Sequence, residues 1–183
     1  MKKVYEYSHL GGRQILQLDY PKVSADIDAV IARVGLPGKT KVSREKTMLG
    51  QLLYSPKELN LQFKEEFRQR GFRELRDTYT IEIPNYGLKI PGAFKQIDFV
   101  KDRVLVEVQF GKYAFMFYDL AKFQYFYNES RADVAVEIVP CHPMHKQMST
   151  GVSYGEQLIY DIERLKRHFP AVPIKVILID VDD

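Results

Sequence analysis

The 183-residue chain is 45% hydrophobic and 13% aromatic, which excludes disordered and fibrous classes. Its net charge of +3 permits a polyanionic partner without requiring one. No apolar run approaches the roughly 18 residues that a membrane span needs, and the start carries no secretion signal, so we expect a cytoplasmic protein with no membrane partner. No repeat, low-complexity segment or Pro/Gly/Ser-rich linker divides the chain, and we expect a single domain over 1–183.

The first half of the chain predicts two amphipathic helices. Ser24 as N-cap, followed by apolar residues at helical spacing, predicts a short helix over 24–35. Ser55 as N-cap and Pro56 at the first helical position predict a second helix over 56–70.

Strands and helices alternate in the second half. Aromatic and β-branched residues predict a strand over 72–83, and a loop through Gly87, Pro91 and Gly92 then leads to two strands within 97–110. The remaining elements are a helix over 113–127, a strand over 133–139, a helix near 154–168 and a final strand over 173–181. This order predicts a mixed α/β fold with a central sheet flanked by helices.

The stretch IDFVKDRVLVEVQFGK, residues 97–112, places polar residues in two otherwise apolar strands. With a turn at 101–102, Asp98 lies on the same face as Glu107 and Gln109 and diagonal to Glu107, while the other face is wholly apolar. Carboxylates this close repel each other unless a cation or a proton lies between them, and Mg²⁺ is the hard cation that suits them. Such an ion would polarise a phosphodiester and acidify a bound water. A solvated strand face with ordinary charges is the alternative.

The same residues resemble a known superfamily. An acidic residue, a nine-residue step to Glu across a hairpin, and a polar residue two positions later resemble the PD-(D/E)xK nucleases. Those places are held here by Asp98, Glu107, Val108 and Gln109. Gln replaces the usual Lys, and with the continuation EVQFGKYAFMFYDLAKFQYF the stretch resembles the BglII and BstYI group of type II restriction endonucleases. The resemblance is dense over 96–126 and thin before residue 55.

The resemblance implies a restriction-endonuclease-like core in which Asp98, Glu107 and the Val108 carbonyl bind Mg²⁺. It also implies that Gln109 positions the attacking water. Because an amide takes up no proton at neutral pH, Gln109 cannot be a general base, so the water must be activated by the metal or by a substrate phosphate.

Two segments are candidates for DNA contacts. The first gathers four basic residues that could meet phosphates, with a solvated loop as the alternative: Lys39, Lys41, Arg44 and Lys46. The second is a loop of polar side chains able to meet base edges: Gln147, Ser149, Thr150 and Ser153.

Ahead of that loop, His142 and His145 are interpreted as ordinary histidines, because Pro143 lies between them and further ligands are lacking. Cys141, the only cysteine, excludes an internal disulfide and is interpreted as a core residue.

The leading hypothesis is a Mg²⁺-dependent type II restriction endonuclease that hydrolyses phosphodiester bonds of double-stranded DNA at a short palindrome. The resemblance further implies a GATC centre and 5′ overhangs. A palindrome mirrors a two-fold axis, so we expect a homodimer, with the aromatic helix 113–127 as one candidate interface. The alternatives are a PD-(D/E)xK nuclease of repair or recombination with little sequence preference, and a non-catalytic DNA-binding module. The presence of both Asp98 and Glu107 argues against the second alternative.

Overall fold

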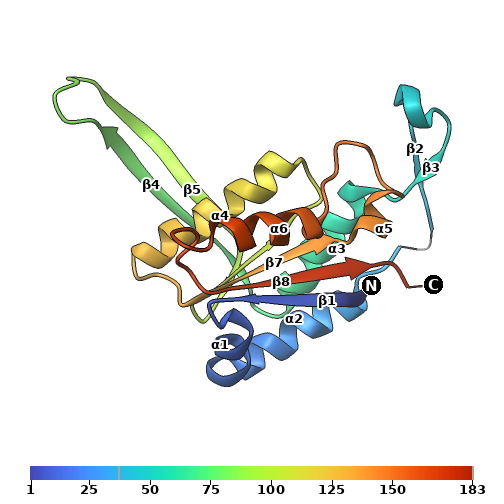
Figure 1. Cartoon of the computed structure of the whole chain (residues 1–183), viewed down its shortest axis with the longest axis horizontal. Helices are drawn as coiled ribbons and strands as arrows, with labels where there is room; N and C mark the ends of the chain where they lie inside the picture. Colours follow the sequence, from blue (N-terminus) through green and yellow to red (C-terminus); the bar gives the residue numbers. More distant parts are fainter. Residues whose placement is uncertain (37, 183) are drawn as a thin grey trace.

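A computed structural model describes residues 1–36 and 38–182. Within these residues, six strands form one mixed sheet in the order β1-β8-β7-β6-β5-β4 (Figure 1). The strands are β1 (Lys2–His9), β4 (Arg73–Glu82), β5 (Lys89–Lys101), β6 (Val104–Val108), β7 (Val134–Pro140) and β8 (Ile174–Asp180). Strands β6, β7 and β8 run parallel, and the other neighbours pair antiparallel. A separate antiparallel pair consists of β2 (Lys41–Val42) and β3 (Leu52–Leu53).

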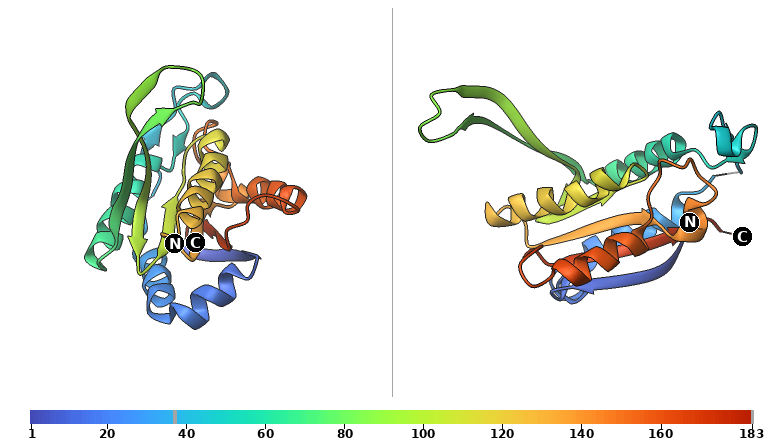
Figure 2. Two further views of the ribbon diagram at one scale, coloured as in Figure 1. Left: turned by 90° about the vertical axis from the view of Figure 1, so that its left-hand side faces the viewer. Right: turned by 45° about the horizontal axis from the view of Figure 1, so that its top comes forward.

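Helices cover both faces of the sheet. They are α1 (Gly12–Asp19), α2 (Pro21–Arg33), α3 (Pro56–Gln69), α4 (Tyr113–Asn128), α5 (His142–His145) and α6 (Gly155–Leu165). Figure 2 shows α2 and α3 on one face and α4 and α6 on the other. The mixed α/β fold with a helix-flanked sheet is therefore confirmed. In the part of the chain that the structure describes, no helix is long and apolar enough to cross a bilayer.

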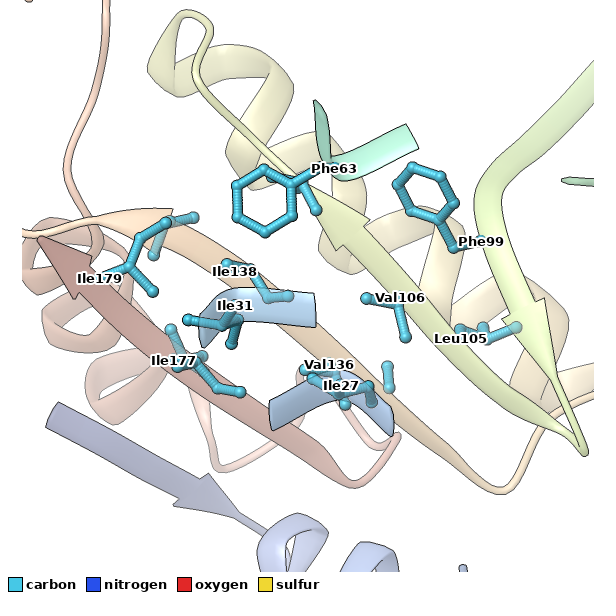
Figure 3. Close-up of a cluster of buried hydrophobic side chains, with 14 of the residues drawn as sticks. Ile27, Ile31, Phe63, Phe99, Leu105, Val106, Val136, Ile138, Ile177 and Ile179 are labelled. Atoms are coloured by element: carbon cyan, nitrogen blue, oxygen red, sulfur yellow. The ribbon is translucent and has the colours of Figure 1, made fainter. Parts of the chain in front are cut away.

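The buried core extends over both faces of the sheet, with α2 and α3 on one face and residues such as Phe123 of α4 and Leu158 of α6 on the other. Figure 3 shows Ile27 and Ile31 of α2 and Phe63 of α3 over the central strands. The ring centroids of Phe67 and Phe99 lie 4.5 Å apart. Burying one such side chain contributes about 1.5–3 kcal/mol relative to leaving it exposed. The face expected to be apolar is buried throughout: Ile97, Phe99, Val104, Val106, Val108 and Phe110.

One of the two early helices begins earlier than predicted. Helix α2 starts at Pro21 with Tyr20 at the N-cap, so Ser24 lies inside the helix, where its backbone N–H donates to the Tyr20 carbonyl. The fixed φ of a proline at the first helical position favours this earlier start. Helix α3 is confirmed, and Ser55 Oγ accepts from the Glu58 backbone N–H at 3.3 Å.

The predicted loop through Pro91 and Gly92 is wrong, because both residues lie inside β5. Strands β4 and β5 form a long hairpin that projects from the body (Figure 1). Tyr79 pairs with Ala93 and Ile81 with Ile90, so two residues of β5 oppose one residue of β4 in a bulge. Gly92 takes a φ of 78° there, which explains how a Pro-Gly pair is accommodated in a strand.

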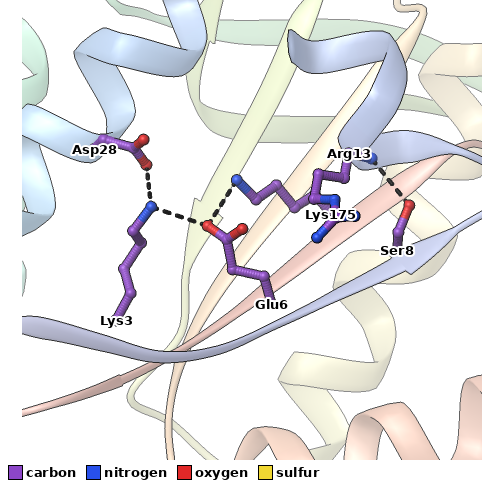
Figure 4. A network of polar contacts seen from close by, with 6 residues as sticks. All are labelled: Lys3, Glu6, Ser8, Arg13, Asp28 and Lys175. Atoms are coloured by element: carbon purple, nitrogen blue, oxygen red, sulfur yellow. Dashed lines mark hydrogen bonds and ion pairs between the residues drawn. The ribbon is translucent and has the colours of Figure 1, made fainter.

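The N-terminal strand β1 was not predicted, and polar contacts attach it to its neighbours (Figure 4). Lys175 of β8 is almost fully buried, and its ammonium lies 2.9 Å from Glu6 of β1. Lys3 lies 2.9 Å from Glu6 and 2.9 Å from Asp28 of α2. The alternation of this edge strand is weak because much of it stays partly exposed, so its sequence carries little strand signal.

Candidate active site

The turn between β5 and β6 differs from the expected one. It is formed by Asp102 and Arg103, whose φ values are 49° and 68°, and Lys101 pairs with Val104 instead of entering the turn. Two positive φ values are typical of the two-residue turns that match the twist of a hairpin. The register therefore slips by two residues relative to the prediction.

An even slip keeps every side chain on its face, so Asp98 still shares a face with Glu107. The pairing of β5 with β6 ends where Phe99 pairs with Val106, which makes Asp98 and Glu107 the next opposed pair instead of a diagonal one. Strand β5 then leaves β6 for the hairpin. The two carboxylates thus lie where the strands separate.

A cavity of about 520 Å³ opens at this separation. Its lining includes Asp98, Val108 and Gln109 from the strands, together with residues of α3. Asp98 is exposed, whereas Glu107 lies behind the cavity and is 3% exposed. Three of the four residues singled out by the resemblance therefore line one cavity, and the fourth is buried beside it.

Helix α4 covers Glu107, so this carboxyl is not solvated, whereas Asp98 on the same face is exposed. Lys122 Nζ lies 2.5 Å from Glu107 Oε1 and 2.7 Å from Asp119 Oδ1. Burial raises the pKa of Glu107, and the Lys122 cation opposes this shift. Burial alone would lower the pKa of Lys122, but Glu107 and Asp119 raise it. The two carboxylates therefore favour the charged form of Lys122.

Gln109 is held at both ends of its amide. Its Nε2 donates to Asp119 Oδ2 at 2.9 Å, and its Oε1 accepts from the Gly111 backbone N–H at 2.9 Å. A Cβ at position 111 would lie 2.6 Å from that Oε1, so glycine leaves room for the amide. The two contacts fix which end of the amide is the donor.

Glu137 of β7 is a further carboxyl that the sequence analysis did not single out. It pairs with Glu107 in the parallel register and is fully buried, and no described residue hydrogen-bonds either of its carboxyl oxygens. Burial raises its pKa well above the ordinary value, which favours the neutral form.

The site fits a hard divalent cation by charge and by ligand type. Three carboxyl groups, those of Asp98, Glu107 and Asp119, gather around the Lys122 cation, and a bound divalent cation would favour their charged forms. Among the described residues, no three His, Cys, Asp or Glu side chains form a group that could hold a metal. A cation between Asp98 and Glu107 would therefore complete its shell with backbone, water or substrate oxygens, as Mg²⁺ commonly does.

The two segments expected to contact DNA lie against each other. Lys41 Nζ, at the start of the basic segment, hydrogen-bonds Ser149 Oγ. The Thr150 backbone N–H donates to Glu45 Oε2 at 3.0 Å. The exposed members of the two segments are Lys39, Lys41, Arg44, Lys46 and Thr150, whereas Gln147 is half-buried and Ser149 and Ser153 are buried.

The polar loop also contacts the segment that follows β6. The Ser153 backbone N–H donates to the Gly111 carbonyl at 2.9 Å, and Gly111 in turn donates to Gln109. The loop is not wholly irregular, since α5 occupies residues 142–145. The adjoining Cys141 is buried.

Helix α3 supplies residues to the cavity that the sequence analysis did not single out. Asn60, Lys64 and Arg68 are spaced four apart, all are exposed, and all line the cavity with Asp98. Residues at this spacing share a helix face. No hydrogen bond or ion pair joins the Lys64 or Arg68 side chain to another described residue. The spacing was readable in the predicted helix, but which face meets the site depends on the tertiary fold.

Comparisons with known proteins show the family and the fold. A family model described as restriction endonuclease BglII/BglIII matches residues 4–179. The crystal structure of BglII complexed with a DNA 16-mer has a TM-score of 0.77 and 23% identity, over 100% of this chain and 79% of that chain. Free BglII has a TM-score of 0.69 and 21% identity, over 100% and 81%. No curated protein sequence matches. The family match begins far upstream of the stretch 96–126 in which the resemblance is dense.

Proposed function

The chain belongs to the BglII/BglIII restriction endonuclease family, and from this membership we propose how it cuts DNA and where. As a type II restriction endonuclease it is a site-specific deoxyribonuclease that acts on double-stranded DNA. The proposal is that it uses Mg²⁺, acts as a homodimer, and cuts a short palindrome with a GATC centre to leave 5′ overhangs. The observation that carries the metal is the placement of Asp98 beside Glu107 where β5 and β6 separate.

In this mechanism Asp98, Glu107 and the Val108 carbonyl hold the metal. A bound Mg²⁺ supplies charge to the scissile phosphate and acidifies a water. Gln109 has one amide hydrogen left after its bond to Asp119, and one lone pair left after its bond from Gly111. Those groups can orient the attacking water. No proton passes to Gln109, because an amide has no basic site at neutral pH.

The DNA backbone would follow the cations around the cavity. Lys64 and Arg68 have no carboxylate partner among the described residues, so both can meet phosphates beside the metal site. The basic segment 39–46 contacts the loop 147–153. Phosphate contacts alone carry no sequence information. We therefore assign the contacts with the bases to that loop, whose Thr150 is exposed.

Digestion of DNA of known sequence, with sequencing of the fragment ends, tests the proposal. We expect discrete fragments whose 5′ overhangs derive from GATC. A smear indicates little sequence preference, and blunt ends or ends without GATC contradict the proposed site. Binding without cutting under either Mg²⁺ or Mn²⁺ would contradict catalysis itself.

Glu107→Gln tests the metal site directly, because it removes charge and keeps shape. We expect cleavage to fall by more than about 100-fold while specific DNA binding stays within about threefold. Glu163→Gln on α6 is the matched control, since that carboxylate is paired with Lys166 away from the cavity. Cleavage by Glu107→Gln within about tenfold of the parent rejects Glu107 as a ligand.

A further inference from the structure

Helix α4 is largely apolar, yet it points a charged pair at the sheet. Asp119 and Lys122 lie three residues apart, on one face of the helix. Asp119 is 2% exposed, and the Lys122 side chain is 14% exposed. Burying a charged side chain is costly unless the charge is paired. The contacts of Asp119 and Lys122 with the strands therefore explain why both are buried here.

Those contacts reach both polar side chains at the end of β6. Lys122 binds Glu107 Oε1 at 2.5 Å. Asp119 Oδ1 accepts from Lys122, and its Oδ2 accepts from Gln109 Nε2. No hydrogen bond from a described residue reaches Glu107 Oε2.

We propose that Lys122 and Asp119 are positioning residues, which hold the metal-binding carboxylate and the water-orienting amide in their reactive geometry. The inference rests on the proposed function and extends it to α4. Lys122 occupies one oxygen of Glu107 and leaves the other for the metal. Asp119 fixes the amide of Gln109, so that the same end of the amide always faces the nucleophile.

Lys122 keeps one hydrogen-bond donor after its contacts with the two carboxylates. Lys122 also lines a second cavity of about 400 Å³ with Asp98 on the α4 side of the site. Its ammonium has three N–H donors, and the two carboxylates take two of them. The remaining donor is free for an oxygen of the substrate or a water in that cavity.

Lys122→Met separates positioning from metal binding, because it removes the cation and keeps an apolar stem of similar length. Loss of a positive charge beside two carboxylates does not weaken their attraction for a divalent cation. We therefore expect Mn²⁺ uptake by the free protein, followed by electron paramagnetic resonance, to stay within about threefold of wild type. The single-turnover cleavage rate at saturating Mg²⁺ and DNA should fall by about 100-fold or more.

Glu107→Gln is the contrasting variant, since it should lose both Mn²⁺ uptake and cleavage. Lys166→Met is the matched control: Lys166, at the C-cap of α6, forms an ion pair with Glu163 at the same three-residue spacing. It should change neither quantity. Thermal unfolding of each variant shows the folded fraction at the assay temperature, and rates are corrected for it.

Restoring the ammonium tests whether charge at this position is what matters. Lys122→Cys treated with 2-bromoethylamine carries an aminoethyl thioether, which matches a lysine side chain in length and charge. Cys141 is the only natural cysteine and is 3% exposed, so mass spectrometry can verify that one thiol reacts. We expect the modified protein to recover at least about a tenth of the wild-type rate, and the unmodified one to stay near Lys122→Met.

Asp119→Asn examines the other half of the pair. An amide at 119 can offer a hydrogen to Gln109, so the Gln109 amide is no longer held one way round. Cleavage should fall by about tenfold or more, with Mn²⁺ uptake retained.

The possible results distinguish the proposed function from the positioning role of Lys122 and Asp119. A wild-type chain that leaves DNA intact overturns the proposed function and this inference with it. If wild type cuts and Lys122→Met cuts within about fivefold of it, only the inference is overturned. It is also overturned if Lys122→Met loses Mn²⁺ uptake as Glu107→Gln does, or if aminoethylation restores nothing.

Discussion

The cations of α3 allow a quantitative test of where the DNA backbone lies. Lys64 and Arg68 line the cavity of Asp98 and are paired with no other described side chain. If each neutralises one phosphate, each contributes about 0.9 to the slope of log K against log salt concentration. The double substitution Lys64→Ala/Arg68→Ala should therefore make the slope shallower by about 1.8 per protomer.

The consequence is large over an ordinary salt range. Between 50 and 200 mM salt, wild type should lose about 12-fold more affinity per protomer than the double variant. Fluorescence anisotropy with a labelled duplex, in buffer containing a chelator so that nothing is cut, measures the slope.

The control removes equal charge on the opposite face of the sheet. Lys166 and Arg167 follow the end of α6, on the side away from α3 (Figure 2), and their double alanine variant has the same net charge. Its slope should match wild type. An unchanged slope for Lys64→Ala/Arg68→Ala, or an equal change in both variants, would refute the placement of the backbone along α3.

Three further substitutions probe the site and the fold. Asp98→Asn should abolish cleavage and weaken the Mg²⁺ uptake measured by isothermal titration calorimetry. Unchanged Mg²⁺ uptake would reject Asp98 as a metal ligand. Gln109→Ala should slow cutting by about 30- to 1,000-fold, about 2–4 kcal/mol of barrier. The cleavage rates of Gln109→Ala and of wild type should rise with pH in the same way, because the amide does not titrate. Loss of this rise in the variant would contradict the role given to Gln109. Glu6→Ala leaves the buried Lys175 without this partner and should lower the free energy of unfolding by about 3 kcal/mol. Calorimetry should show a melting temperature lower by roughly 6–12 °C, and an unchanged value would show the pair to be dispensable.

Local sequence signals predicted those elements whose ends carry explicit chemistry. Helix α3 follows from Ser55 and Pro56, and β7 ends at Pro140 as expected. Elements without such signals were missed or misplaced. Strand β1 was missed because it is an edge strand with mixed exposure. The bulge at Gly92 accommodates a Pro-Gly pair inside β5, although such a pair usually predicts a loop.

The common face of Asp98 and Glu107 was predicted although the register of the hairpin was wrong. Asp102 and Arg103 are not residues that usually take positive φ in a hairpin turn, so the sequence did not indicate the turn. The error was harmless because the slip is even. A slip of one residue would have sent Glu107 to the α3 side, into the wholly apolar layer.

The surroundings of Glu107 illustrate what a sequence can and cannot indicate about a buried charge. A carboxylate between valines in a strand covered by a helix needs a cation, and a nearby source is the helix that follows in the chain. Lys122 is 15 residues from Glu107, and Asp119 is 10 residues from Gln109, so both contacts lie within one strand–helix unit. A charged residue in an otherwise apolar helix directly after such a strand is therefore a readable signal. Glu137 gives no equivalent signal, because its neighbour Glu107 comes from the strand pairing and not from spacing along the chain. The contacts of Lys122 and Asp119 could be inferred from the order of strand and helix along the chain. The position of Glu137 beside Glu107 depends on how β6 and β7 pair, which only the fold shows.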